Sequence, residues 1–237
     1  MLNTSEKTLA DEPDQTLAPL SLSDRVYRRI ESLILSGKLK SGERLNDSRL
    51  AEMFSTSRGP VRNALARLAE VGLVDIIPYR GAFVRDLDLD DVLEIYEIRA
   101  ALERAGVLAA ARKMTPAALT RLSEIAERMH ECVAQGDRET YFELNLTFHQ
   151  LIHQTSGNRR LQELYERYTR EQKLYRHFSL ITLGIEESHH EHQAIMQALL
   201  DGDGERAAAG MEAHVLSART RLEAAVRRSQ AGRETEP

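Results

Sequence analysis

This sequence has very little cysteine, no tryptophan and no long apolar run. Cys132 is the only cysteine and there is no tryptophan. No disulfide can therefore form within the chain, and we expect the Cys132 thiol to be a buried structural residue. No run approaches the roughly 20 consecutive apolar residues that a membrane span requires. The first twenty residues also lack the apolar stretch of a signal peptide. These absences favour a cytoplasmic protein without a membrane partner.

Glycine is also scarce, with 13 residues, whereas hydrophobic residues make up 42% of the chain and charged residues 29%. This balance excludes collagen and low-complexity sequence, and it is typical of a helix-rich globular protein. A chain of 237 residues is long enough for two domains, because single domains commonly have about 100 to 200 residues. Residues 1–20 are polar and aperiodic, so we expect a disordered arm there.

The charge of the chain is unevenly distributed. Its formal net charge is −5. Residues 21–87 carry 12 lysines and arginines against 8 acidic residues, a net charge of +4, which leaves −9 on the remainder. A basic segment joined to an acidic body suits a molecule that binds phosphates with one part only.

The basic segment has the pattern of three helices. Residues 21–37 place Val26, Ile30 and Ile34 on one helical face, with Ser23 as the expected N-cap and Gly37 as the stop. A brief second helix follows in DSRLAEMF. We expect it to pack on the first helix through the apolar side chains Leu50, Met53 and Phe54.

The third helix and the residues after it predict a DNA-binding surface. Ser57 is placed to cap this helix, and Pro60 falls in its first turn, where a missing N–H costs nothing. Arg58 and Arg62 are four residues apart and share one exposed flank. The stretches LVDII, PYRG and AFVRD predict a two-stranded wing with Arg80 at its tip. A single exposed arginine is usually a solvated charge, but three helices, a wing and a basic margin together favour DNA binding.

These residues carry a specific resemblance. The stretch GERLNDSRLAEMFSTSRGPVRNALARLAEVGLVDIIPYRGAFV resembles the winged helix-turn-helix of the GntR family of bacterial regulators. Asn63 and Asp47 stand where members often have Glu, which implies an altered operator preference. The resemblance implies that seven residues bind DNA, with Arg49 the weakest candidate: Arg49, Ser57, Arg58, Gly59, Arg62, Arg80 and Gly81.

After residue 87 the sequence becomes helical and acidic. Thr115-Pro116, Gly136-Asp137, Gly157-Asn158 and Gly202-Asp203-Gly204 separate helical stretches. The predicted fold is mainly α: a winged helix-turn-helix over 21–87, an all-α six-helix bundle over 88–228 and a flexible tail over 229–237. The six amphipathic stretches run approximately over 90–113, 116–135, 137–155, 158–182, 186–201 and 204–228.

All eight histidines follow residue 129. Asn145 and His149 are four residues apart, hence on one face of a helix. His192 and His214 flank the turn DGDG symmetrically, so an antiparallel hairpin would place both imidazoles at one level. Three imidazoles and an amide oxygen from three helices suit a divalent ion such as Zn, Ni, Mn or Co.

This arrangement resembles the FCD ligand-binding domain of the FadR subfamily of GntR regulators, over about residues 88–228. The resemblance implies a metal held by Asp-x-x-x-His and two later histidines. Asn145 replaces the usual Asp, and a neutral amide is a weaker ligand than a carboxylate, so a metal-free polar pocket is the alternative. Three other histidines match no ligand position and are expected at the surface or behind the ligands: His153, His189 and His190.

Arg99 matches an arginine that often faces the effector cavity in this subfamily. Its fork of donors suits a carboxylate. A surface ion pair with Glu103, four residues later, is an equally good interpretation.

Three functions fit these patterns. The first is a homodimeric regulator, expected to be a repressor, that binds a pseudo-palindromic operator and responds to a small carboxylate effector. The second is a metal sensor, in which the ion is the signal. The third is a metallohydrolase, which would leave the winged helix without a purpose. No Glu is set as in H-E-x-x-H, because Glu191, beside His192, points to a different face. We therefore expect no enzyme activity.

Overall fold

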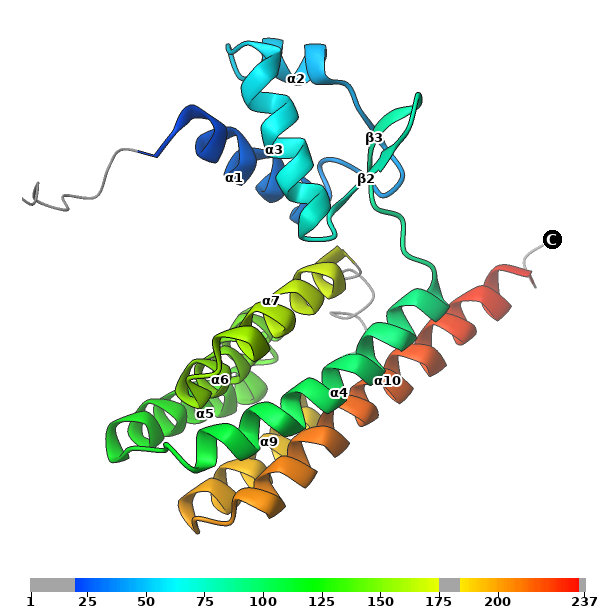
Figure 1. Cartoon of the computed structure of the whole chain (residues 1–237). Helices are drawn as coiled ribbons and strands as arrows, with labels where there is room; N and C mark the ends of the chain where they lie inside the picture. Colours follow the sequence, from blue (N-terminus) through cyan, green and yellow to red (C-terminus); the bar gives the residue numbers. More distant parts are fainter. Residues whose placement is uncertain (1–19, 175–183, 235–237) are drawn as a thin grey trace, which may run out of the picture.

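The computed structural model describes residues 20–174 and 184–234 as two domains (Figure 1). The expected N-terminal arm lies outside the described residues, apart from residue 20. The first domain is a helical unit with a small sheet. Its elements are α1 (Leu22–Leu35), β1 (Arg44–Leu45), α2 (Asp47–Met53), α3 (Arg58–Glu70), β2 (Val74–Ile77) and β3 (Gly81–Val84).

Helix α1 begins two residues earlier than the sequence predicted. Its N-cap is Ser21, not Ser23, because the Ser21 hydroxyl accepts from the Asp24 backbone N–H while the Asp24 carboxylate accepts from the Ser21 backbone N–H. This reciprocal capping satisfies two backbone donors at once, which Ser23 could not do. At the other end, Gly37 adopts a φ of +71°, as expected for the residue that stops the helix.

Helix α2 packs on the first domain's core through one narrow face. Leu50 is buried and Phe54 is partly buried against that core, as predicted. Met53, however, is 52% exposed, so the prediction that it packs on α1 is wrong. The helix has only seven residues, and its buried positions are Leu50 and the neighbouring Ala51, which turn Met53 toward solvent.

The wing has a third strand that the sequence did not predict. The antiparallel sheet has the order β1-β3-β2, with Val74 opposite Val84 and Arg44 opposite Phe83. Strand β1 has two residues, too few for the alternating pattern by which a strand is recognised in sequence. Its pairing fixes the chain between α1 and α2 against the wing.

The second domain is a bundle of long helices, as predicted. The start of each predicted stretch is confirmed to within one or two residues, and a capping side chain marks five of the six described starts, α9 being the exception. The end of the fourth predicted stretch, over 175–182, lies outside the described residues. The described helices are α4 (Leu89–Ala111), α5 (Pro116–Gln135), α6 (Arg138–Ser156), α7 (Arg159–Leu174), α9 (Ile185–Leu200) and α10 (Gly204–Glu234).

Helix α10 extends beyond the expected end of the domain. It continues to Glu234, so the prediction of a flexible tail from residue 229 is wrong as far as residue 234. The sequence after residue 228 contains one glycine and no proline before residue 237. An isolated glycine lowers helix stability without ending a helix.

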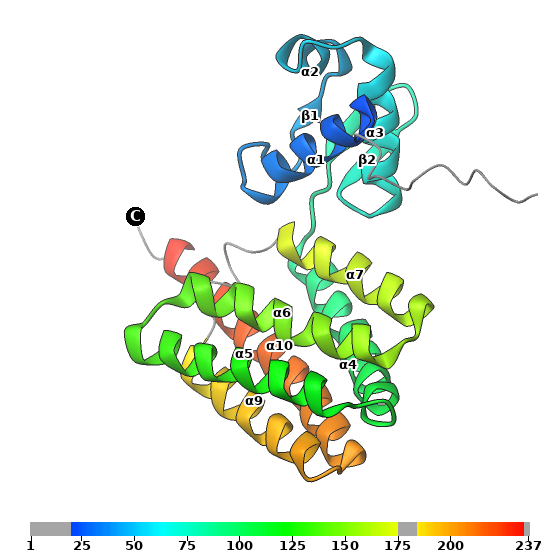
Figure 2. The ribbon, with the colours of Figure 1, turned by 90° about the vertical axis from the view of Figure 1, so that its left-hand side faces the viewer.

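The bundle has a large apolar core formed by α4, α5, α6, α9 and α10, and a smaller apolar cluster between α4 and α10. The winged domain lies against one side of the bundle. Helix α10 packs along α4 and α9, α5 packs on α6 and α9, and α4 also contacts α6 and α7. Figure 2 shows the winged domain next to the end of α7. Leu174 of α7 packs against the winged domain's core, and Arg85 pairs with Glu171 at 3.5 Å. In the described part of the chain, every helix is too short or too polar to cross a lipid bilayer.

Candidate functional site

Three helices bring three histidines to one buried point in the bundle. His149 comes from α6, His192 from α9 and His214 from α10, and their candidate ligand atoms all lie within 4.8 Å of one another. The rings of His192 and His214 are 4.3 Å apart between centroids. An antiparallel hairpin of α9 and α10 about residue 203 predicts this placement of the two imidazoles at the same level. A cluster of imidazoles at this spacing is the donor set that divalent transition metals prefer.

Each imidazole is oriented by an acceptor behind it. His149 Nδ1 donates to Glu103 Oε1 at 2.6 Å, and His192 Nδ1 donates to the Ser188 carbonyl at 2.7 Å. His214 Nδ1 donates to Glu191 Oε2 at 2.6 Å. Because ionised carboxylates and carbonyl groups only accept, the proton is on Nδ1 in each ring. The Nε2 lone pairs are therefore available to a ligand, as in protein metal sites.

Several polar atoms at this point have no protein partner among the described residues. Nε2 of His149, Nε2 of His192 and Oδ1 of Asn145 are buried and unpaired. Buried polar atoms normally have a partner, so three together indicate a missing ligand. Asn145 and His149 line a cavity of about 40 Å³, room for an ion with one or two small ligand atoms. The residues therefore fit a divalent ion with Asn145, His149, His192 and His214 as donors.

Asn145 lacks the negative charge that an Asp would supply, but two carboxylates behind the histidines supply negative charge instead. Glu103 and Glu191 bond directly to His149 and His214. Burial raises the pKa of Glu191, but hydrogen bonds from His214 and Arg221 outweigh it and hold the pKa at about 2. Burial likewise opposes ionisation of Glu103, yet its contacts with His149 and His153 keep its pKa well below the usual range. Two ionised carboxylates thus face the histidines from behind.

Burial favours the neutral form of two of the three histidines, His192 and His214. Burial lowers the pKa of His192 well below its ordinary value, and the neighbouring His214 and His149 add to this effect. Burial also lowers the pKa of His214, although the bond to Glu191 opposes the shift. Only a neutral imidazole offers a lone pair to a metal.

Arg99 lies at the edge of the same cavity, and its ion pair with Glu103 is buried. The side chains of Arg99 and Glu103 are 5% and 0% exposed, and Nη2 lies 3.3 Å from Oε1. The interpretation of this pair as a surface interaction is therefore wrong. Arg99 also donates to the Gln172 side-chain oxygen, while Gln172 Nε2 donates to the Tyr96 hydroxyl at 2.7 Å. Arg99, Gln172 and Tyr96 all line the cavity.

Sequence reasoning missed the residues behind the histidines. Glu191 was set aside because it points away from His192, yet it faces His214 on the next helix. Glu103 was considered only as a partner of Arg99. The position of Glu103 in the sequence does not indicate that it bonds two histidines of α6, because that contact depends on how the helices pack.

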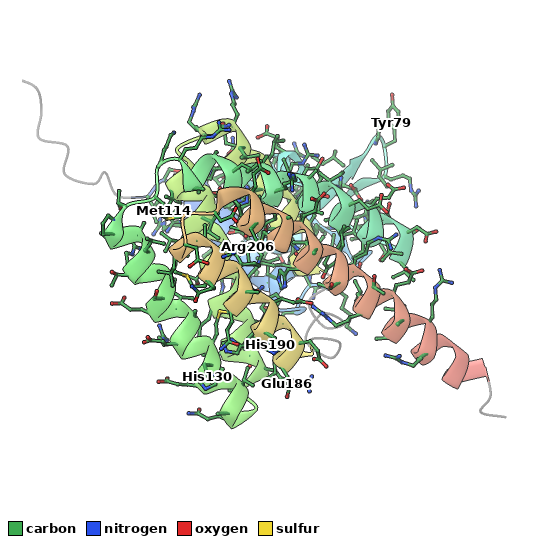
Figure 3. All side chains as sticks on the ribbon, turned by 90° about the horizontal axis from the view of Figure 1, so that it is seen from below. Tyr79, Met114, His130, Glu186, His190 and Arg206 are labelled. Carbon is green, nitrogen blue, oxygen red and sulfur yellow. The ribbon has the colours of Figure 1, made fainter. Side chains whose placement is uncertain are left out.

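The three other histidines considered above differ in their surroundings: His153 lies behind the site, His190 at the surface, and His189 is buried against α5. His153 is buried behind the site, 3.1 Å from Glu103 and stacked on Tyr165. His190 is exposed on the outer face of α9 (Figure 3). His189 is 6% exposed and contacts His130 of α5 at 3.2 Å.

The residues predicted to bind DNA are exposed on α2, at the start of α3 and in the wing. Ser57 is the N-cap residue of α3, but its side chain makes no capping hydrogen bond, so that part of the prediction is wrong. Arg58, Gly59 and Arg62 are exposed on the first turns of α3, and Arg49 is exposed on α2. Arg62 Nε donates to Asp47 at 2.8 Å.

The wing contributes further exposed groups. Arg80 lies in the turn between β2 and β3, with its guanidinium 5.7 Å from the Phe83 ring centroid, and Gly81 has a φ of +106°. Tyr79 at the same turn is fully exposed and projects from the domain (Figure 3). Arg44 of β1 lies beside Gly81, lining a groove between the wing and α3. Neither Tyr79 nor Arg44 belongs to the recognition-helix pattern, so the sequence did not single them out.

Two protein families match separate parts of the chain. The family described as "Bacterial regulatory proteins, gntR family" matches residues 22–84, and the FCD domain matches residues 94–218. LutR of Bacillus subtilis, a transcriptional regulator, is 30% identical over 77% of this chain and 93% of its own. YdhC of the same organism, described as an uncharacterized regulator, is 34% identical over 59% of this chain, and the match spans only 63% of YdhC.

A solved structure has the same architecture. Escherichia coli McbR/YncC superposes with a TM-score of 0.72 and 26% sequence identity, covering 86% of this chain and 98% of McbR/YncC. The family matches, the relatives and the fold agree that this is a regulator and not an enzyme, which removes the metallohydrolase alternative. The chain belongs to the GntR family of DNA-binding transcription regulators and carries an FCD domain.

Proposed function

We propose that this protein is a cytoplasmic homodimeric repressor that binds a pseudo-palindromic operator and responds to a small carboxylate effector in a metal-containing cavity. The observation that carries the proposal is the cavity beside the three histidines. Their donor atoms lie within 4.8 Å of one another, and two of the three rings present an unpaired, buried Nε2. A carboxylate-binding arginine, Arg99, lines the same cavity.

The donor set favours a borderline divalent ion, Zn, Ni, Mn or Co, at Asn145, His149, His192 and His214. When bound, such an ion supplies positive charge and open coordination positions for a carboxylate. This chain's residues orient the imidazoles through Glu103, Glu191 and the Ser188 carbonyl. They also keep water out, because each of the three histidines is buried.

The size of the cavity limits the effector. A volume of about 40 Å³ holds one or two water-sized groups, less than an acid of several carbon atoms requires. A larger acid must therefore displace the side chains that close the cavity, Arg99 and Gln172 among them. Gln172 sits on the last described turn of α7. Effector binding would thus act on the helix that contacts the winged domain.

Helix α7 offers a route from the cavity to the DNA-binding surface. Gln172 bonds Arg99 and Tyr96 on the cavity side. The preceding residue, Glu171, pairs with Arg85 at the end of the wing, and its carboxylate lies against Gly72 so closely that a Cβ there would meet it at 2.2 Å. An effector changes operator affinity to the extent that it binds the DNA-competent and released arrangements differently.

The DNA-binding part of the proposal is tested with a duplex selected from a random library by the wild-type protein. Arg58→Ala and Arg62→Ala should each weaken binding of this duplex at least tenfold, because a dimer loses two contacts worth about 1–3 kcal/mol each. Arg160→Ala, whose side chain is 81% exposed on α7, is the matched control. Unchanged binding by both recognition-helix variants at physiological salt would contradict the assignment.

The effector part is tested by thermal shift of Zn-loaded protein with a panel of small carboxylic acids. An acid at about 100 times its dissociation constant adds about 2.7 kcal/mol to stability and should raise the Tm. Arg99→Ala should abolish the shift. Arg104→Ala, one turn along α4 and paired with Glu205 and Glu212, should keep it. If only the metal changes Tm and duplex affinity, the protein is a metal sensor instead.

A further inference from the structure

An ion pair joins the two helices of the helix-turn-helix at the DNA-binding surface. Asp47 is the first residue of α2, and its Oδ2 accepts a hydrogen bond from Arg62 Nε of α3 at 2.8 Å. The bond from Arg62 is the main reason that the pKa of Asp47 is lowered, and the nearby Arg58 contributes. The carboxylate is therefore ionised at physiological pH and bound to one edge of the guanidinium.

The contact leaves the outer edge of Arg62 available. The Arg62 side chain is 70% exposed, against 27% for Asp47. Within the described residues, Nε is the only Arg62 side-chain nitrogen with a hydrogen bond to protein. Because the guanidinium is planar, a bond at Nε fixes the plane in which the two terminal nitrogens point outward. Two parallel N–H groups in a fixed plane match the O6 and N7 acceptors of guanine.

We propose that Asp47 is a positioning residue for operator recognition: it orients Arg62 so that the terminal nitrogens contact a base instead of the nearest phosphate. The inference rests on the proposed function, because it takes Arg62 as an operator contact. Asp47 itself touches no DNA in this account. It acts through the rotamer of Arg62.

The groove around Arg62 explains why sequence specificity would be lost if Asp47 did not hold the Arg62 side chain. Asp47 and Arg62 line a groove of about 320 Å³ between α3 and the wing, together with Arg44 and Gly81. Arg44 is exposed and supplies a second positive charge there. Such a groove attracts the phosphate backbone, and phosphate contacts raise affinity for every sequence equally. Asp47 holds Arg62 away from contact with phosphate, and its negative charge repels the phosphate backbone.

A structural role for Asp47 gives a different result. An acidic residue in the first turn of α2 stabilises the helix through the backbone dipole. The N-cap is already provided by Asn46, whose side chain accepts from the backbone N–H groups of Ser48 and Arg49. Loss of helix stability would weaken binding to all duplexes. Loss of positioning would change the ratio between them.

The test compares Asp47→Ala, Asp47→Glu, Arg62→Ala and the double variant of the full chain. Affinity is measured for the selected duplex and for a shuffled duplex over a range of salt. Asp47→Ala should lower the ratio of the two affinities about five- to hundredfold, the effect of losing a bidentate base contact. Its binding to the shuffled duplex should depend more steeply on salt, by about one phosphate contact per subunit. Asp47→Glu should restore much of the ratio, and Glu52→Gln, an exposed acid of α2, should leave it unchanged.

Repeating the selection of duplexes from a random library with each variant identifies the base pairs at which specificity is lost. Asp47→Ala and Arg62→Ala should relax the same base pair in each half-site, and Asp47→Ala should add no further loss in the Arg62→Ala background. The inference is wrong if Asp47→Ala leaves the ratio unchanged, or lowers it equally when Arg62 is absent. If the wild-type protein enriches no duplex at all, the operator-binding proposal fails instead.

Discussion

Glu103 is the residue on which most contacts of the histidine cavity converge. Its two carboxylate oxygens bond His149 at 2.6 Å and His153 at 3.1 Å, and Arg99 pairs with it at 3.3 Å. All four side chains are buried. A single carboxylate thus orients one candidate metal ligand and balances the charge of the candidate effector-binding arginine.

Substitution of Glu103 by Gln should weaken the site and the fold together. A lost carboxylate behind a ligating histidine typically lowers metal affinity about 10- to 100-fold. Removing the partner of the buried Arg99 should lower the free energy of unfolding by about 3–5 kcal/mol. Metal competition with a chromophoric chelator and urea denaturation measure the two effects. Glu97→Gln is the control, because Glu97 pairs with Arg219 at 3.1 Å but is 61% exposed. Equal effects of both substitutions would contradict the role given to Glu103.

The buried His192 gives the metal-free protein a defined pH dependence. Burial lowers the folded-state pKa of His192 well below that of the unfolded chain. As the pH falls below about 6.5, His192 therefore takes up a proton only on unfolding, and stability is lost by at most about 1.4 kcal/mol per pH unit for this group. Above that pH the contribution is fully present.

We expect His192→Gln to reduce the fall in unfolding free energy between pH 7.5 and 5.5, measured by urea denaturation in the presence of a chelator. His190→Gln serves as the control, because His190 is exposed on the same helix. A pH dependence that His192→Gln leaves as steep as in the wild type would show that the histidine is not held neutral by burial.

Helix α7 is the element that connects the two domains. Its last described turn bonds Arg99 and Tyr96 through Gln172, pairs with Arg85 through Glu171, and packs on the winged domain's core through Leu174. Adjacent positions of a helix face different directions, so one turn can contact the cavity and the winged domain at once. This placement makes α7 the route by which cavity occupancy reaches the DNA-binding surface in the proposed function.

Loss of the Arg85–Glu171 pair should loosen the contact between the domains. We expect Glu171→Gln to accelerate tryptic cleavage after Arg85 several-fold, because Asp75, at 3.0 Å, is then the only ionic partner of Arg85 among the described residues. The cleaved bond is identified by the masses of the fragments. Glu166→Gln is the comparison on the same helix, since the hydrogen bond and the ion pair of Glu166 are with Gln162 and Arg170 of α7 itself. Cleavage at equal rates in both variants would show that the pair does not hold the domains together.

Helix ends could be predicted from the sequence where a residue type determines the local backbone conformation. Pro116, Gly136 and Gly157 mark helix ends through local conformation, and the structure has the helix ends there. Strand β1 was not predictable, because two residues carry no period and its pairing with β3 is non-local. The proximity of His192 and His214 followed from their spacing about a turn, whereas the contacts of Glu103 and Glu191 depend on packing between helices. The fold was therefore more predictable than the surroundings of the site.

The whole molecule, in the proposed function, is a dimer whose helical domains hold two winged domains at the spacing of operator half-sites. Reading a pseudo-palindrome requires a two-fold assembly. We expect residues 88–234 to fold as a helical homodimer without DNA, as judged by sedimentation. The fragment includes all of α10. A monomeric fragment beside a dimeric full chain would place the dimer contact in the winged domain.

Metal content tests the central claim most directly, because the control of DNA binding proposed here depends on what the three histidines hold. The full chain is loaded with excess Zn, desalted and analysed by elemental analysis, beside His192→Ala and the exposed-site control His190→Ala. We expect about one ion per chain for the wild type and for His190→Ala, and almost none for His192→Ala, with folding intact by circular dichroism. Equal metal content in all three proteins, or none in the wild type, would contradict the claim.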